Sequence, residues 1–177
     1  MAHFLFRIKS FLSWWLEAVD EHSLHSPFFF DLYTKHIKPA VEPGQFTQIE
    51  NLRQKLLGDE RVIVVDDVGM NRNTKAERTI SFVARTTLST QRFSTIYARL
   101  AKSFNAKCIV ELGAAFGINT LYLAEKADAS VSTFEGSVAI ADIAALTFEF
   151  AGKQNIHLIR GDIDKTLPAF LQTVRRV

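Results

Sequence analysis

A turn of small residues between an apolar strand and a helix constrains this chain more than any other feature. Cys108–Leu112 has the apolar, β-branched character of a buried strand, and Asn119–Lys126 has the spacing of a helix. Between them, Gly113 and Gly117 allow a ligand to approach the backbone closely. The free N–H groups and the positive dipole end at the helix start attract an anionic group. The segment therefore predicts a ligand-binding strand–turn–helix unit.

Two more strand–helix pairs follow this turn with short links. Val131–Phe134 and Ile156–Ile159 have the pattern of strands, and Ala139–Phe150 and Leu167–Val174 that of helices. A β-α-β-α-β-α order is typical of an α/β fold, with a parallel sheet, covering helices and right-handed crossovers. We therefore expect half of a Rossmann-like sheet with strand order 3-2-1.

The turn distinguishes between two classes of cofactor. A dinucleotide site prefers G-x-G-x-x-G; counted from Gly113, the other glycines would fall on Ala115 and Ile118. A pyrophosphate would also be repelled by Glu111, two residues before the first glycine. An amino-acid cofactor brings an ammonium as well as a carboxylate, and it suits a site that holds an acid and N–H donors. An NAD-dependent oxidoreductase is therefore disfavoured.

The pattern Glu111-x-Gly113-x-x-x-Gly117 resembles the first motif of the class I S-adenosylmethionine-dependent methyltransferases. The resemblance covers roughly Ile96–Phe170. The chain looks like the small-molecule O-methyltransferase-like members of this class. It implies S-adenosylmethionine as cofactor and a small molecule as methyl acceptor. The cofactor-binding residues that it implies are Glu111 for the methionine amino group, the turn residues Gly113, Ala115 and Gly117, Glu135 for the ribose hydroxyls, Asp162 for the adenine amino group and Ile163 for the adenine ring. Ala115 departs from the family, in which many members carry glycine, and alanine fits if φ there is negative.

A complete class I fold has further strands after the third βα unit, and this chain ends at Val177. The part of that fold that faces the methyl group is missing, so no catalytic base can be named. We expect a shortened form or fragment of a methyltransferase. Alternatively, Val62–Val65 or a partner chain pairs with the open sheet edge. A further alternative is a non-catalytic module that binds the cofactor or self-associates through its N-terminal helices.

The residues before the cofactor-binding half, 1–88, are expected to form a mostly helical extension, with 89–177 as the cofactor-binding half-domain. The elements predicted upstream of Cys108 are helices at Phe4–Glu21, Phe28–Ile37 and Ile49–Leu57, a strand at Val62–Val65, a mobile polar loop at Asn71–Lys75 and a helix from Thr79 to Phe104. Ile96, Leu100 and Phe104 share one stripe of the last helix, and Thr90 or Ser94 could cap its second half.

The first predicted helix, Phe4–Glu21, has a wide apolar face. Such a helix needs a partner, which could be the rest of this chain, a second subunit or a membrane surface, and packing on protein is favoured. It is too short and too polar to span a bilayer, and Arg7 and Lys9 interrupt the apolar run that a signal peptide requires. The sequence therefore allows a homo-oligomer and predicts no transmembrane segment.

Charge and cysteine content limit the partners, disulfides and metal sites that this protein could have. The net charge is only +2, and Lys and Arg are scattered among the acidic residues. A chain without a clustered basic face does not favour nucleic acid as a partner. The single cysteine, Cys108, excludes an intramolecular disulfide and a Cys-based metal site; we expect a buried thiol and a reducing, cytoplasmic setting. His22, His25 and His36 are expected at the surface or at helix ends, and Asp66 and Asp67 in an acidic turn. No metal site is predicted.

Overall fold

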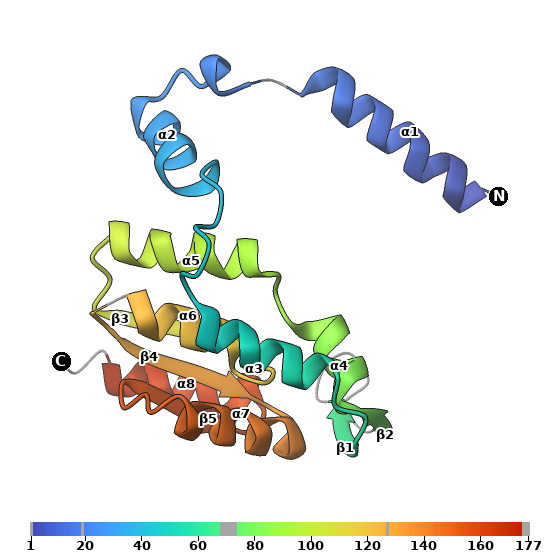
Figure 1. The fold of residues 1–177 in the computed structure, drawn as a ribbon, viewed down its shortest axis with the longest axis vertical. Coiled ribbons are helices and arrows are strands. Elements are labelled where there is room, and N and C mark those ends of the chain that lie inside the picture. Colours follow the sequence, from blue (N-terminus) through green and yellow to red (C-terminus); the bar gives the residue numbers. More distant parts are fainter. Residues whose placement is uncertain (1, 19, 68–73, 127, 175–177) are drawn as a thin grey trace. The chain divides into compact units, whose positions relative to one another are not determined.

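The computed structural model describes residues 2–18, 20–67, 74–126 and 128–174, which form two compact units, Met1–Ala40 and Val41–Val177 (Figure 1). The polar loop expected at Asn71–Lys75 lies largely outside the described residues. Among the described residues, no helix is long and apolar enough to cross a membrane.

The first unit consists of short helices. These are α1 (Ala2–Glu17), the 3-10 turn η1 (Glu21–Ser23), α2 (Pro27–Leu32) and the π-helical turn η2 (Tyr33–Ile37). The helix predicted to continue to Glu21 ends at Glu17, and Asp20 begins η1 by accepting a hydrogen bond from the backbone N–H of His22 (3.1 Å). Pro27 stands at the start of α2, where its missing N–H costs nothing.

The second unit contains the remaining helices and both sheets. Its helices are α3 (Thr47–Leu57), α4 (Ile80–Thr87), α5 (Gln91–Ser103), α6 (Ile118–Lys126), α7 (Val138–Phe150) and α8 (Ile163–Val174). Its strands are β1 (Val62–Asp67), β2 (Thr74–Thr79), β3 (Cys108–Leu112), β4 (Ser130–Glu135) and β5 (Ile156–Arg160). The predicted β-α-β-α-β-α succession is confirmed from β3 to α8.

The sheet β3-β4-β5 is parallel, with β4 in the middle, which is the predicted order. Glu111 pairs in register with Thr133, and its carboxylate accepts hydrogen bonds from the hydroxyls of Thr133 and of Thr120 in α6. The next residue of β4, Phe134, points to the other face, where its ring contacts that of Phe170 in α8 at 5.5 Å between centroids. Helices α6 and α8 therefore cover opposite faces of the sheet.

Helices α3 and α5 pack on α6 and complete the main core (Figure 1). The buried residues of this core are Phe46, Ile49, Ala98, Ile118, Leu121, Tyr122, Ala144 and Phe148. A second core joins α4 to α7 and to the turn between β3 and α6 through Ile80, Val83, Ala84, Phe116 and Ile140. The segment 41–88 thus packs on the half that we assigned to cofactor binding, and the functional division at residue 88 stays a prediction.

The single helix predicted from Thr79 to Phe104 is wrong, because the chain forms α4 and α5 with a break between them. Each helix has its own threonine cap: Thr79 accepts from the backbone N–H of Phe82, and Thr90, a predicted cap, accepts from that of Phe93. The Arg85–Thr90 segment is rich in hydroxyl side chains that bond to backbone and lower helix propensity. Phe104 is 58% exposed and does not belong to the buried stripe.

Of the hairpin β1–β2, the sequence predicts β1 and not β2. β2 has the sequence TKAERT, without the apolar alternation that signals a strand, and its pairing with β1 decides its conformation. Because β1 pairs with β2 in a separate sheet, Val62–Val65 do not fill the open edge of β3.

The expectation of a buried thiol at Cys108 is also wrong, because Cys108 is exposed. It shares a face of β3 with Val110 and Leu112, which are 41% and 54% exposed. On this face α8 packs against β4, the middle strand, and leaves the apolar side chains of β3 open to solvent.

Candidate functional site

Glu111 is the penultimate residue of β3, and its half-buried carboxylate is held by three side chains. Oε1 accepts from Nδ2 of Asn119 (2.7 Å), and Oε2 accepts from the hydroxyls of Thr120 (2.5 Å) and Thr133 (2.6 Å). A carboxylate offers about four acceptor positions, so this arrangement fixes its orientation and leaves room for one further donor.

The turn after β3 lies against the end of β4. The backbone N–H groups of Gly113 and Ala114 both donate to the carbonyl of Phe134, at 3.0 and 2.8 Å. Gly113 has a φ of +90°, and nothing lies within 4 Å of the position that a Cβ would occupy. The chain therefore turns sharply here and presents bare backbone to open space.

Ala115 adopts a left-handed backbone conformation, with φ +47°. The negative φ that would let alanine fit this position without strain is not found. The conformation costs about 1 kcal/mol for a residue with a Cβ, and it directs the N–H of Ala115 to Oε2 of Glu135 (3.0 Å). The strain is thus coupled to a contact between two predicted site residues.

Gly117 is required for packing within the core. It has a φ of +82°, and an added Cβ would lie 2.3 Å from a ring carbon of Phe148 in α7. The missing side chain makes room for this buried ring on that side of the backbone. Close helix packing therefore explains Gly117, while ligand approach at Gly113 stays a prediction.

Glu135 ends β4 and joins the two neighbouring loops. Its carboxylate accepts from the backbone N–H groups of Ala115 (3.0 Å) and Ser137 (2.9 Å). Burial raises the pKa of Glu135 above its ordinary value, while hydrogen bonds from the backbone of Ser137, Ala115 and Gly136 act in the opposite direction.

Asp162 and Ile163 lie where β5 leads into α8, and both are half-buried. Oδ1 of Asp162 accepts from the backbone N–H of Asp164 (3.0 Å), so Asp162 helps to cap α8. The N–H of Gly161 donates to the carbonyl of Glu135 (2.9 Å). The structure thus brings the ends of β3, β4 and β5 together at one edge, as predicted.

Sequence reasoning missed several polar residues at this edge. Asn119, Thr120 and Thr133 orient Glu111, and Ser137 starts α7 beside Glu135. At this edge of the sheet, Oδ1 of Asn119 and Oγ of Ser137 are buried without a hydrogen-bond partner among the described residues. A polar residue in the first turn of a helix that follows a glycine turn is the signal that could have found Asn119 and Thr120.

The candidate metal ligands do not converge within the described part of the chain. No group of three or more His, Cys, Asp or Glu residues there could hold a metal ion. Asp66 belongs to β1 and forms an ion pair with Lys75 of β2 at 3.4 Å. His22 and His25 are exposed in the first unit.

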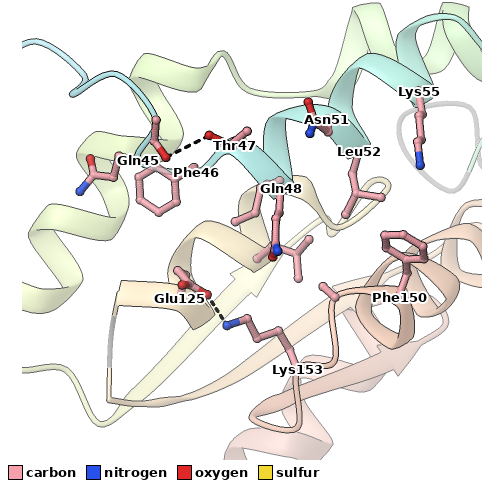
Figure 2. Close-up of a pocket in the computed structure, with 14 residues that line it drawn as sticks. Gln45, Phe46, Thr47, Gln48, Asn51, Leu52, Lys55, Glu125, Phe150 and Lys153 are labelled. Carbon is pink, nitrogen blue, oxygen red and sulfur yellow. Dashed lines mark hydrogen bonds and ion pairs between the residues drawn. The ribbon is translucent and has the colours of Figure 1, made fainter.

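A cavity of about 680 Å³ lies away from the predicted site, near the C-terminal ends of α6 and α7 (Figure 2). Lys55 of α3 stacks over the ring of Phe150 at 5.2 Å, and Lys153 pairs with Glu125. None of the predicted cofactor-binding residues lines this cavity.

No protein-family model matches the sequence. No curated protein matches it either.

The chain shares a Rossmann-like fold with a solved structure that is named as an O-methyltransferase. It is similar to a protein from Staphylococcus aureus whose name assigns it to the caffeoyl-CoA O-methyltransferases, with a TM-score of 0.50 and 18% identity over 78% of this chain and 51% of the other. An O-methyltransferase from Bacillus cereus, crystallised in complex with SAH, has a TM-score of 0.46 and 16% identity over 82% of this chain and 53% of its own. The chain therefore spans about half the length of these solved structures.

Proposed function

We propose that this chain binds S-adenosylmethionine at the carboxyl edge of β3-β4-β5 and forms the cofactor-binding part of a class I methyltransferase. The observation that carries the proposal is the fixed carboxylate of Glu111 beside the unpartnered, buried Oδ1 of Asn119. An ammonium group donates three hydrogen bonds and would fit both acceptors. The open space at Gly113 admits the rest of an amino-acid moiety.

Glu135 is proposed to hold the ribose. Its two oxygens already accept from backbone N–H groups on either side, so the carboxylate is oriented before any ligand arrives. The remaining acceptor positions suit a pair of hydroxyl donors. Asp162 and Ile163, at the end of the third strand, would contact the adenine.

A dinucleotide is a poorer fit to the same turn. Ile118, where that motif requires glycine, is 1% exposed and belongs to the main core. Glu111 would face a pyrophosphate with a like charge, whereas it complements an ammonium. The turn thus supports a methyltransferase over an NAD-dependent oxidoreductase.

Bound S-adenosylmethionine would supply an activated methyl group for in-line transfer to a nucleophile. The residues of this chain would bind and orient the cofactor, which reduces the entropic cost of the reaction. We propose a small-molecule acceptor and a cytoplasmic location. No residue of this chain is proposed as the catalytic base.

Calorimetric titration of the full chain with S-adenosylhomocysteine, with NAD as a control ligand, tests the proposal. We expect micromolar binding of S-adenosylhomocysteine and none of NAD. Glu135→Gln should weaken binding at least tenfold, because one of the oxygens becomes a donor. Glu149→Gln, on an exposed position of α7, is the matched control and should bind normally.

Absence of binding by the folded wild-type chain, or equal effects of the two Gln variants, would reject the proposed site. A panel of small acceptors with labelled cofactor then separates an enzyme from a non-catalytic module. Binding without any methyl transfer would favour the module.

A further inference from the structure

Helix α1 carries a face of large apolar side chains that is bordered by cations. At about 100° per residue, most of the large apolar side chains of α1 fall within an arc of about 140°, and Phe6 and Trp14 lie outside it. The arc, called here the apolar face of α1, includes Phe4, Leu5, Phe11, Leu12, Trp15 and Leu16. Arg7 borders it on one side and Lys9 on the other, while Ser10, Ser13 and Glu17 lie on the opposite arc.

The side chains of the apolar face of α1 are exposed. The six side chains named above are between 48% and 75% exposed. Apolar area of this extent, gathered on one side of a helix, marks an interaction surface.

We propose that the apolar face of α1 binds the surface of a lipid bilayer that contains anionic lipids, with the helix lying in the plane of the interface. Arg7 and Lys9 can extend along the apolar side chains and place their charges among phosphate headgroups. The acid of α1, Glu17, lies on the opposite arc at the last residue. The charges that accompany the apolar face thus complement an anionic surface.

The length of α1 agrees with an in-plane orientation. Its 16 residues extend about 24 Å, less than the ~30 Å thickness of a bilayer's hydrocarbon core. Indole rings prefer the membrane interface, where the ring is apolar and its N–H reaches polar groups, and Trp15 stands in the middle of the face.

A second copy of the chain fits the same face less well. Parallel pairing of two α1 helices would place Arg7 of one copy beside Lys9 of the other, and like charges at these flanking positions oppose association. Neither border of the face offers an acid to pair with these cations.

The chain itself provides a sensitive probe, because its two tryptophans, Trp14 and Trp15, both lie in α1. Vesicles of phosphatidylcholine with about one third phosphatidylglycerol should sediment the full chain and shift tryptophan emission to the blue. The shift should be large in Trp14→Phe, which retains Trp15, and small in Trp15→Phe. Replacing Arg7 and Lys9 by Gln should weaken binding about 20- to 30-fold, since each cation contributes about fivefold near such a surface.

A matched pair of double variants tests the face itself. Phe11→Ser with Trp15→Ser should abolish vesicle binding, whereas Phe6→Ser with Trp14→Ser, the same residue types outside the arc, should preserve it. Both pairs lie outside the unit Val41–Val177 and should leave its thermal unfolding unchanged.

Equal binding of the two double variants, or no binding by the wild type, would overturn the proposal. Emission from Trp15 that is already blue-shifted without vesicles would also overturn it. A rise in molecular mass with concentration would then assign the face to a second copy, and an unchanged mass would assign it to this chain's own surface.

Discussion

The backbone N–H of Ala115 donates a 3.0 Å hydrogen bond to the carboxylate of Glu135, and this contact ties the turn after β3 to the end of β4. Burial raises the pKa of Glu135 above its ordinary value near 4.5. The folded state therefore retains the proton to a higher pH than the unfolded chain does. The contribution of the Glu135 carboxyl to stability is complete below the ordinary pKa and is lost as the pH rises through the raised pKa.

We expect Glu135→Gln to remove this pH dependence, because glutamine does not titrate. Urea unfolding of both chains across the acidic range measures the difference in free energy, which should move in favour of the variant as the pH rises. Glu149→Gln should follow the wild type. A wild type whose stability relative to Glu135→Gln is constant over this range would contradict the raised pKa.

Ala115→Gly should stabilise the fold by about 1 kcal/mol, because glycine adopts a positive φ without the Cβ clash. The φ of +47° and the hydrogen bond to Glu135 should both persist. Thermal unfolding tests the change, and Ala139→Gly, near the start of α7, serves as an opposite control that should destabilise. A loss of stability in Ala115→Gly would show that the turn does not strain alanine.

Gly117→Ala and Gly113→Ala should differ strongly, although both residues have a positive φ. At Gly113 a methyl group meets open space, so only backbone strain of about 1–2 kcal/mol is expected. At Gly117 the methyl would overlap the buried ring of Phe148, and the added overpacking should cost a further ~1–3 kcal/mol. Denaturant unfolding measures both variants; equal losses would mean that Phe148 moves away without cost.

Tyr122→Phe should destabilise the chain by about 1–2 kcal/mol, because it removes a buried hydrogen bond. The Tyr122 hydroxyl donates to Oε1 of Glu50 at 2.6 Å, and Arg53, paired with Glu50, also donates to the carbonyl of Ser89. This network connects α6, α3 and the loop before α5. Tyr97→Phe, at a 44% exposed position, should be nearly neutral in the same unfolding measurement.

The same network predicts that the protein loses stability at alkaline pH. Burial, followed by the hydrogen bond to Glu50, raises the pKa of Tyr122 well above its ordinary value near 10. Its contribution is present below that ordinary value and is lost as the pH rises beyond it, because the unfolded chain ionises first. The stability of the wild type should therefore fall above about pH 10 more steeply than that of Tyr122→Phe, and equal slopes would refute this.

Several parts of the fold could be predicted because local pattern and tertiary environment agree. The strands β3, β4 and β5 are apolar and short, the helices between them have helical apolar spacing, and Gly113 marks the turn. Strand ends in a parallel sheet meet at one edge, so the sequence was sufficient to bring Glu111, Glu135 and Asp162 together.

Other parts could not be predicted, because they depend on what each residue meets in space. β2 is a strand through pairing with β1, and its own residues have weak strand preference. Cys108 is exposed because α8 packs against β4 and leaves β3 uncovered on that face. The sequence marked Gly117 as a turn residue, whereas its neighbour Phe148 comes from a helix far along the chain.

The sequence by itself determined the succession of strands and helices, the glycine turn and the acids at the strand ends, because these follow from local spacing and backbone preference. Only the tertiary structure decided that Ala115 is left-handed, that Asn119, Thr120 and Thr133 orient Glu111, and that Phe148 lies against Gly117. These features arise from contacts between residues distant in sequence, and local spacing carries no record of such contacts.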